Sequence, residues 1–204
     1  MPNANDYHFI THWRASGATL REVYDLIADA EALPQWWPAV YLAVTEAPGQ
    51  NAQPNGIGRA FDLYTKGWLP YTLRWRMRVR ALDPPHGLTI GAEGDFVGRG
   101  IWTFVERDGG VDITFDWKLA AEKPLLRLMS PLLKPAFSAN HRWAMQIGET
   151  SLRSELERRR GATAAAPPGP TTWQPWAAFG VLALLIAGTT AALIASRSDQ
   201  DASR

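Results

Sequence analysis

The sequence predicts an α+β protein in which a curved, antiparallel seven-stranded sheet wraps around one long C-terminal helix, with a transmembrane helix after it. Three observations lead to this prediction. In many segments up to residue 121, apolar residues alternate with polar ones, which is the side-chain period of a half-buried strand. From Pro124 onward the period is helical. The later segment Trp176–Ser196 holds 21 residues without a charge.

The expected order is one strand, two helices, six strands and one long helix. Residues 7–15 alternate as the first strand. Thr19 and Glu22 then form a T-x-x-E capping box at the start of a helix, and the short segment EALPQWWP follows that helix. Strand patterns return at residues 40–47, 59–66, 71–83, 87–92, 96–106 and 111–121.

The long helix is expected to begin at a proline. Pro131 and Pro135 should break the first helical residues, because proline lacks the N–H that a helix interior needs. Pro135 can then serve as the first residue of a helix that ends near Arg160. Its inward stripe is expected to be Phe137, His141, Met145, Gly148 and Leu152.

Composition divides the chain into a globular domain at residues 1–160, a Pro/Ala-rich linker at 161–175, the apolar segment at 176–196 and a short tail at 197–204. As a helix, the apolar segment would span about 31 Å, close to the ~30 Å hydrocarbon core of a bilayer. The extended linker could reach about 45 Å at ~3.1 Å per residue. We therefore expect a domain tethered to a membrane.

Two features predict the orientation of this tether. Arg158, Arg159 and Arg160 lie just before the linker, where the positive-inside rule counts basic residues, although Arg197 lies beyond the span. The N-terminus, MPNANDYHFITHW, lacks the basic and apolar regions of a signal peptide. The expectation is a single-pass protein of the cell membrane with a cytoplasmic N-terminal domain.

Arg74, Arg76, Arg78 and Arg80 alternate with apolar residues and must share one face of their strand. The formal net charge of the chain is only +1, so it lacks the basic excess of a nucleic-acid-binding protein. We interpret these arginines as a solvated outer face that pairs with acidic residues on neighbouring strands. A surface for a partner or for anionic lipid is the alternative.

The opposite face carries bulky apolar side chains from at least three strands, namely Trp75, Met77, Trp102, Phe104, Phe115 and Trp117. They point toward the long helix, and Tyr71 and Tyr64 can add polar groups nearby. The pattern alone leaves open whether these side chains fill a core or line an apolar pocket.

Few residues suggest chemistry. The chain has no cysteine, and it lacks the motifs of zinc proteases, P-loop proteins and serine hydrolases. His8 and His12 share a strand face about 13 Å apart, which is too far for one metal ion. We predict no metal and no cofactor. His141 is the one titratable group expected on the apolar inward face, as a hydrogen-bonded core residue, a ligand contact or an acid–base catalyst.

Four segments resemble the START/polyketide-cyclase (SRPBCC) superfamily, and in particular a bacterial branch of it: TLREVYDLIADAEALPQWWPAV, YTKGWLPYTLRWRMRV, GDFVGRGIW and ANHRWAMQIGETSLRSEL. The resemblance covers about residues 5–160. It implies a helix-grip fold with an elongated hydrophobic cavity between the sheet and the last helix. Members bind lipids, sterols, quinones, hormones or polyketides, and some catalyse cyclisation or dehydration. The resemblance transfers no catalytic residue, because a fold does not determine a function.

We therefore expect a membrane-tethered binder or carrier of a hydrophobic small molecule such as a lipid, a quinone or a polyketide-like compound. One alternative is a cyclase- or dehydratase-type enzyme with His141 as acid–base. Another is a membrane-anchored interaction module, in which the small residues Ala183, Ala187 and Ala191 would allow a homodimer through the span. The candidate ligand-binding residues are Tyr71, Trp75, Met77, Trp102, Phe104, Phe115, Trp117, Phe137, His141 and Met145.

Overall fold

The structure is a computed structural model of the chain and describes residues 6–47, 52–121 and 124–172. Seven antiparallel strands form one sheet in the order β1-β7-β6-β5-β4-β3-β2. Three helical segments, α1 (Leu20–Ala28), η1 (Ala30–Ala32) and α2 (Leu33–Trp36), connect β1 to β2. The strands are β1 (Asp6–Ser16), β2 (Tyr41–Glu46), β3 (Ala60–Lys66), β4 (Thr72–Asp83), β5 (Gly87–Gly94), β6 (Phe96–Arg107) and β7 (Gly110–Ala121).

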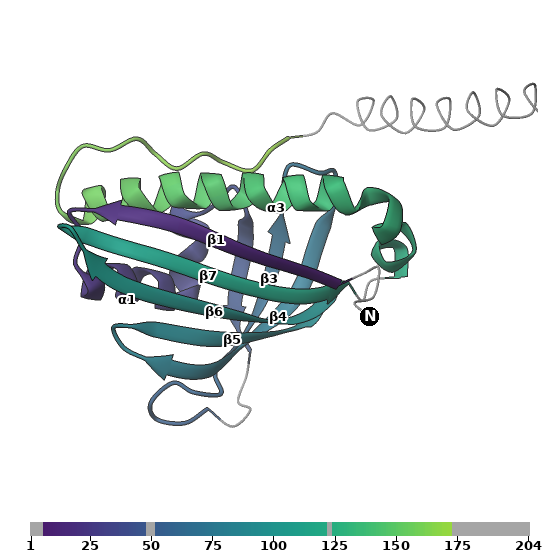
Figure 1. Ribbon diagram of the computed structural model, residues 1–204, viewed down its shortest axis with the longest axis horizontal. Coiled ribbons are helices and arrows are strands. Elements are labelled where there is room, and N and C mark those ends of the chain that lie inside the picture. Colours follow the sequence, from purple (N-terminus) through teal and green to yellow (C-terminus); the bar gives the residue numbers. More distant parts are fainter. Residues whose placement is uncertain (1–5, 48–51, 122–123, 173–204) are drawn as a thin grey trace, which may run out of the picture. The chain divides into compact units, whose positions relative to one another are not determined.

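The last helix, α3 (Pro124–Arg159), lies along one face of this sheet (Figure 1). The sheet curves around the helix, so that β1 and β7 flank it on one side and β3 and β4 on the other (Figure 1). The prediction of an α+β fold with a seven-stranded antiparallel sheet around a long C-terminal helix is confirmed. The two short helices that were predicted between the first and second strands are also present.

The start of the long helix was predicted wrongly. Helix α3 begins at Pro124 and runs through both Pro131 and Pro135. Proline removes one hydrogen bond and bends a helix, but the bonds before and after it can continue the same helix. The first turns of α3 bend away from the rest (Figure 1), as prolines in this region would lead one to expect.

The predicted inward stripe of α3 is buried at its C-terminal half only. Met145, Gly148 and Leu152 are buried, while Phe137 and His141 are half-buried. The helix therefore packs tightly on the sheet at one end and stands further from it at the other.

Side chains of α3 hold the helix against β1, an edge strand of the sheet. The carboxylate of Glu149 accepts a hydrogen bond of 2.9 Å from the backbone N–H of Arg14, and Arg153 Nε donates one of 2.8 Å to the Arg14 carbonyl. Lys134 Nζ donates to the carbonyl of Asp6 at 2.9 Å. These bonds use backbone groups of β1 that would otherwise be open to pairing with another strand.

The end of α3 is joined to the start of α1. The capping box predicted for Thr19 and Glu22 is present, with the Thr19 N–H donating to the Glu22 carboxylate at 2.8 Å. Arg160, just after α3, donates to the same carboxylate through two nitrogens at 2.8 and 2.7 Å. These bonds to Arg160, followed by the bond from Thr19, lower the pKa of Glu22 to about 2.

The stripe of arginines on β4 forms the solvated outer face that was predicted. Arg76 makes a bidentate pair with Asp62 on β3, at 2.7 and 2.9 Å, and Arg80 pairs with Glu93 on β5 at 3.1 Å. The guanidinium of Arg74 lies 4.8 Å from the centre of the Tyr64 ring. Pairs this exposed each contribute at most about 1 kcal/mol to stability.

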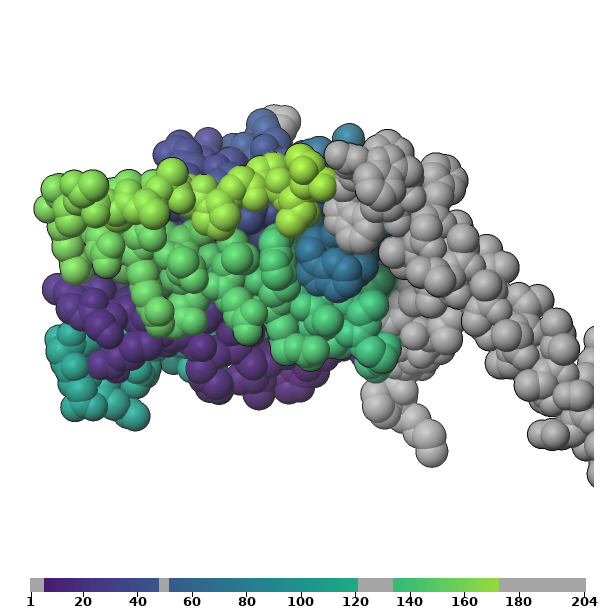
Figure 2. All heavy atoms as spheres, turned by 90° about the horizontal axis from the view of Figure 1, so that it is seen from above, coloured from purple at the N-terminus to yellow at the C-terminus, as the bar shows by residue number. Residues whose placement is uncertain are grey.

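Residues 161–172, the described part of the linker, contain no helix or strand. Residues 161–170 belong to the same compact unit as the sheet and run back along α3 in both views (Figures 1 and 2). Within the described residues, no helix is both long and apolar enough to cross a bilayer. The predicted span at 176–196 and the tail at 197–204 lie outside the described residues, so both stay predictions.

The bond between Arg160 and Glu22 makes a testable prediction. Replacing Arg160 by Gln should raise the Glu22 pKa from about 2 toward its ordinary value of 4.5, measured by following the Glu22 carboxyl in an NMR pH titration. Because the folded pKa is depressed, the stabilisation from this group is present above pH 4.5 and is lost as the pH falls toward 2. Acid unfolding of the variant should therefore begin at a higher pH.

The matched control is Arg159→Gln, because Arg159 pairs with Glu155 on its own helix and not with Glu22. If the two variants raise the pKa of Glu22 equally, the bond from Arg160 is not the cause of its low value.

Candidate ligand-binding site

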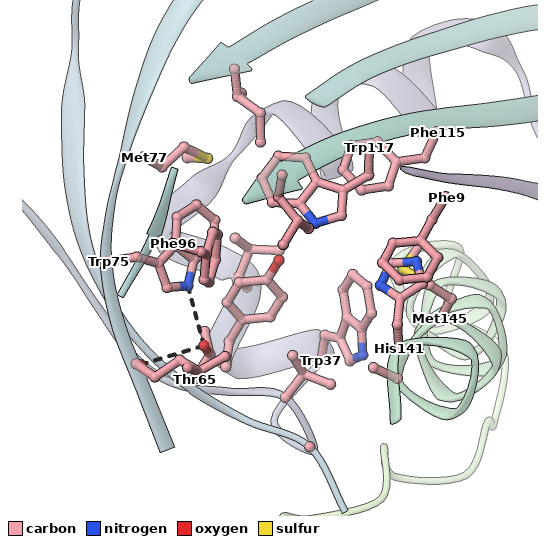
Figure 3. Close-up of a pocket in the computed structure, with 18 of the residues that line it drawn as sticks. Phe9, Trp37, Thr65, Trp75, Met77, Phe96, Phe115, Trp117, His141 and Met145 are labelled. Carbon is pink, nitrogen blue, oxygen red and sulfur yellow. Dashed lines mark hydrogen bonds between the residues drawn. The ribbon is translucent and has the colours of Figure 1, made fainter. Parts of the chain in front are cut away.

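A cavity of about 220 Å³ lies between the inner face of the sheet, the α1–α2 segment and α3 (Figure 3). A water molecule needs roughly 10–15 Å³ of such volume, so the cavity has space for about 15 to 20 water-sized groups. Its lining is mostly aromatic and aliphatic, and Lys66 is the one charged residue among the described residues that form it. The cavity therefore suits a compact apolar compound better than a long chain or a highly charged one.

The sheet side of the cavity is a row of stacked rings on β6 and β7. Trp102 and Phe115 are register partners, with ring centroids 4.1 Å apart and planes 17° apart. Phe115 and Trp117 continue the row at 5.4 Å and 23°. A Cβ atom on Gly100 would lie 2.7 Å from the Phe115 ring, so the glycine makes room for the row. Gly100, in the segment GDFVGRGIW, therefore allows the rings of the neighbouring strand to pack over it.

The wall formed by β3 and β4 has already satisfied its polar groups. Trp75 Nε1 donates a hydrogen bond of 3.1 Å to the Thr65 hydroxyl, which in turn donates to the Leu73 carbonyl at 3.5 Å (Figure 3). The Trp75 ring also packs on Phe96, with centroids 5.1 Å apart. This wall therefore presents an apolar surface that requires no hydrogen bond from a ligand.

The α3 side is different, because a buried nitrogen of His141 has no hydrogen-bond partner among the described residues. The His141 ring stacks on Phe9 of β1, with centroids 4.0 Å apart and planes 17° apart. Its Nε2 atom is buried, and the described residues offer it no hydrogen-bond partner. Burial, with a smaller effect from the charge of Arg142, lowers the pKa of His141 to about 4. The imidazole is therefore neutral at pH 7.

Trp37 completes the same side of the cavity (Figure 3). Its indole packs against α3 at Gly148, where an added Cβ atom would lie 2.3 Å from Trp37 Cζ2. The Nε1 atoms of Trp36 and Trp37 are buried and also lack a partner among the described residues. Glycine at position 148 is what allows the helix to approach this tryptophan so closely.

The structure brings nine of the ten sequence-predicted candidates together around the cavity. These are Tyr71, Trp75, Met77, Trp102, Phe115, Trp117, Phe137, His141 and Met145. Phe104 does not line it. Its side chain is 1% exposed, and its ring centroid lies 6.1 Å from that of Tyr24 on α1, so it belongs to the core.

Several lining residues were missed from the sequence. The alternation of residues 7–15 that placed His8 and His12 on one face also places Tyr7 and Phe9 on the other, so that signal was available. Phe96 has the same parity as Trp102 and Phe104 in the predicted strand 96–106, so its direction could also have been assigned. Trp36 and Trp37 lie in the short segment EALPQWWP, which has no strand or helix period. The missed aromatic residues are Tyr7, Phe9, Trp36, Trp37, Tyr41 and Phe96.

The described residues contain no group of three or more histidine, cysteine or acidic side chains that could hold a metal ion. His8 Nε2 lies 2.9 Å from Asp116 Oδ1, and His12 Nδ1 lies 3.3 Å from the Thr114 hydroxyl, both on the outer face of the sheet.

Comparison with known proteins agrees with this architecture. Residues 10–157 match the family described as polyketide cyclase/dehydrase and lipid transport. The chain belongs to this family. A comparison with curated proteins found no matching sequence.

Three solved structures are similar to this chain in fold. The Zhui aromatase/cyclase from Streptomyces sp. R1128 is 14% identical with a TM-score of 0.58, over 78% of this chain and 99% of that one. The protein TTHA0849 from Thermus thermophilus is 19% identical with a TM-score of 0.54, over 76% and 95%. The di-domain ARO/CYC BexL from the BE-7585A biosynthetic pathway is 13% identical with a TM-score of 0.53, over 73% and 50%. The chain thus spans about half of that di-domain protein, and at these identities the likeness shows the fold alone.

Replacing Gly148 by Ala should destabilise the domain. Alanine favours a helix interior by about 1 kcal/mol over glycine. Here its Cβ would meet the Trp37 ring, and such overpacking typically costs about 1–3 kcal/mol. We expect a lower free energy of unfolding, measured in urea, and a changed near-UV circular-dichroism signal from tryptophan. Thr150→Ala, at an exposed position of the same helix, is the control and should change neither by a comparable amount. A Gly148→Ala variant as stable as the wild type would contradict the packing argument.

Burial of His141 makes stability depend on pH. The unfolded chain binds the histidine proton first, near pH 6.5, whereas the folded chain binds it near pH 4. Folding stability should therefore fall as the pH drops from 6.5 to 4, by up to about 1.4 kcal/mol per pH unit from this residue. His141→Gln should flatten that part of the profile, measured by urea unfolding at several pH values. Identical slopes for the two proteins would show that His141 does not titrate as assigned.

Proposed function

We propose that this chain binds a hydrophobic small molecule in the cavity beneath α3, as a binding or carrier protein rather than an enzyme. The observation that carries the proposal is the cavity itself, since about 220 Å³ of space remains among stacked aromatic side chains. Apolar pockets with few polar groups are typical of small-molecule sites. Membership of a family that includes lipid transport supports the same function.

The proposal includes a membrane tether. The uncharged segment Trp176–Ser196 and the basic residues Arg158–Arg160 support a single span with the domain on the cytoplasmic side. A tether would keep the cavity near a membrane-soluble ligand. Cell fractionation tests it: the full-length chain should sediment with membranes and resist extraction by carbonate, and recovery in the soluble fraction would refute the tether.

A second candidate function is a cyclase- or dehydratase-type enzyme, favoured by the likeness in fold to an aromatase/cyclase. Among the described residues that line the cavity, His141 is the only histidine and none is acidic. With a pKa of about 4 it is a weak base at neutral pH, and no carboxylate among the described residues bonds to it. His141→Ala should abolish turnover and retain binding if the enzyme hypothesis holds.

A third candidate, an interaction module that uses the Arg74–Arg80 face or a dimer through the span, has less support. Arg76, Arg78 and Arg80 already interact with carboxylates on neighbouring strands. Replacing Arg76 and Arg80 by Glu should leave liposome binding and partner capture unchanged if the face is only solvated. Analytical ultracentrifugation in detergent would reveal a dimer.

Filling the cavity should block binding. Ala144 on α3 lines the cavity, whereas Ala139 on the same helix is half-buried and does not. Ala144→Phe should therefore abolish co-purification of a lipophilic compound, detected by native mass spectrometry of the full-length chain and by organic extraction. Ala139→Phe adds the same volume elsewhere and should retain the compound. A wild-type protein that stays free of any adduct after incubation with a membrane lipid extract would refute the proposed function.

A further inference from the structure

Three titratable groups that line the cavity, on Tyr41, Tyr71 and His141, are neutral at pH 7. Burial raises the pKa of Tyr41 and of Tyr71 above the ordinary value for tyrosine, and it lowers that of His141. In the described part of the lining Lys66 is the one charged residue, and it has an interaction of its own. A buried carboxylate needs a paired cation or several hydrogen bonds to offset the loss of hydration. The cavity therefore suits an uncharged ligand.

Among the described lining residues, His141, Trp36 and Trp37 carry buried nitrogens that have no hydrogen-bond partner. Trp75 and Thr65 satisfy each other on the opposite wall. The imidazole of His141, by contrast, makes no hydrogen bond to any other described residue, and its Nε2 atom is enclosed by protein. Figure 3 shows one imidazole nitrogen directed toward the cavity. Because Nε2 is enclosed, Nδ1 is the nitrogen left to meet a ligand.

The tautomer of His141 follows from the same burial. A neutral imidazole has one N–H and one lone pair. A buried unpaired N–H is rarer in proteins than an acceptor whose lone pairs are under-satisfied. The favoured arrangement therefore leaves the lone pair on enclosed Nε2 and the proton on Nδ1, where a ligand oxygen can accept it.

The shape of the cavity favours a flat ligand. Trp102, Phe115 and Trp117 form one row of nearly parallel rings, and the stacked pair of Phe9 and His141 forms a second aromatic surface. Flat ring systems gain offset-stacking and edge contacts against such surfaces. Space for about 15 to 20 water-sized groups is enough for two or three fused six-membered rings, about 10 to 14 ring atoms, with a short substituent.

We propose that the ligand is a compact, uncharged, planar ring compound with a carbonyl or comparable acceptor oxygen, and that His141 selects it by donating a hydrogen bond from Nδ1. This inference rests on the proposed function, binding in the cavity, and adds the class of ligand and the residue that determines specificity. It disfavours fatty acids, which carry a charge and a long chain.

Two probes of nearly equal shape test the inference. 2-Acetylnaphthalene has the acceptor carbonyl, and 2-ethylnaphthalene replaces it with a methylene group. The full-length wild type, in nanodiscs with protein-free nanodiscs as the blank, should bind the ketone about tenfold more tightly than the hydrocarbon by tryptophan fluorescence quenching, the size of effect expected for one hydrogen bond. The anion 2-naphthoate should bind more weakly than either.

Variants at position 141 separate the hydrogen bond from packing. His141→Leu should remove the preference for the ketone and leave the affinity for 2-ethylnaphthalene within about threefold. His141→Gln, which retains an N–H donor, should restore part of the preference. For each protein we take the ratio of its affinities for the ketone and the hydrocarbon. Because each probe enters the lipid to the same extent with every protein, comparing these ratios between proteins removes that effect.

The outcomes distinguish the two levels of the argument. Equal affinities of the wild type for the two neutral probes, or a preference that survives in His141→Leu, would overturn the inference and leave the proposed function standing. Tighter binding of 2-naphthoate would also overturn it. If none of the probes binds and the wild type carries no lipophilic adduct, both the inference and the proposed function are wrong.

Discussion

The polar contacts that hold α3 over the sheet determine whether a cavity exists at all. An apolar helix facing an apolar sheet gains free energy by closing any gap between them, because each buried methylene contributes about 0.8 kcal/mol. Here Glu149 and Arg153 hold the C-terminal half of the helix to the backbone of Arg14, and Arg160 holds its end to Glu22. Lys134 adds one bond to the Asp6 carbonyl nearer the start of the helix. Between these contacts, at Phe137 and His141, the helix is only half-buried. The cavity lies beneath this less tightly packed part.

The side chains around the cavity also resist its collapse. Stacked indole and phenyl rings are stiff, and the row formed by Trp102, Phe115 and Trp117 keeps its shape because each ring supports the next. Two glycines allow this arrangement, Gly100 under the row and Gly148 against Trp37. Smaller aliphatic side chains could repack to fill the same space. The aromatic composition thus favours a cavity of defined shape.

Much of this architecture could be predicted from the sequence, because side-chain period reports which face of an element is buried. The alternation in β4 separates the arginines from Trp75 and Met77, and the structure retains that division. Period does not report position along a strand, and Phe104 shares the inner face of β6 with Trp102 yet packs under α1. Nor can it locate Trp37, whose contact with Gly148 joins residues more than 100 positions apart. The size of the cavity depends on how far α3 stands from the sheet, which only the folded chain determines.

The environment of His141 bears on whether the family's two known kinds of activity can coexist in this chain. Burial against Phe9 removes water from the imidazole and lowers its pKa, so that it stays neutral at pH 7. A neutral imidazole without a water shell donates a well-directed hydrogen bond, which favours selective binding. The same burial makes it a poor proton acceptor, since catalysis by a general base works best with a pKa near the working pH. A catalytic role would require a ligand that itself brings negative charge beside the ring and raises the pKa. This environment supports our proposal of a binding or carrier function over the enzyme alternative.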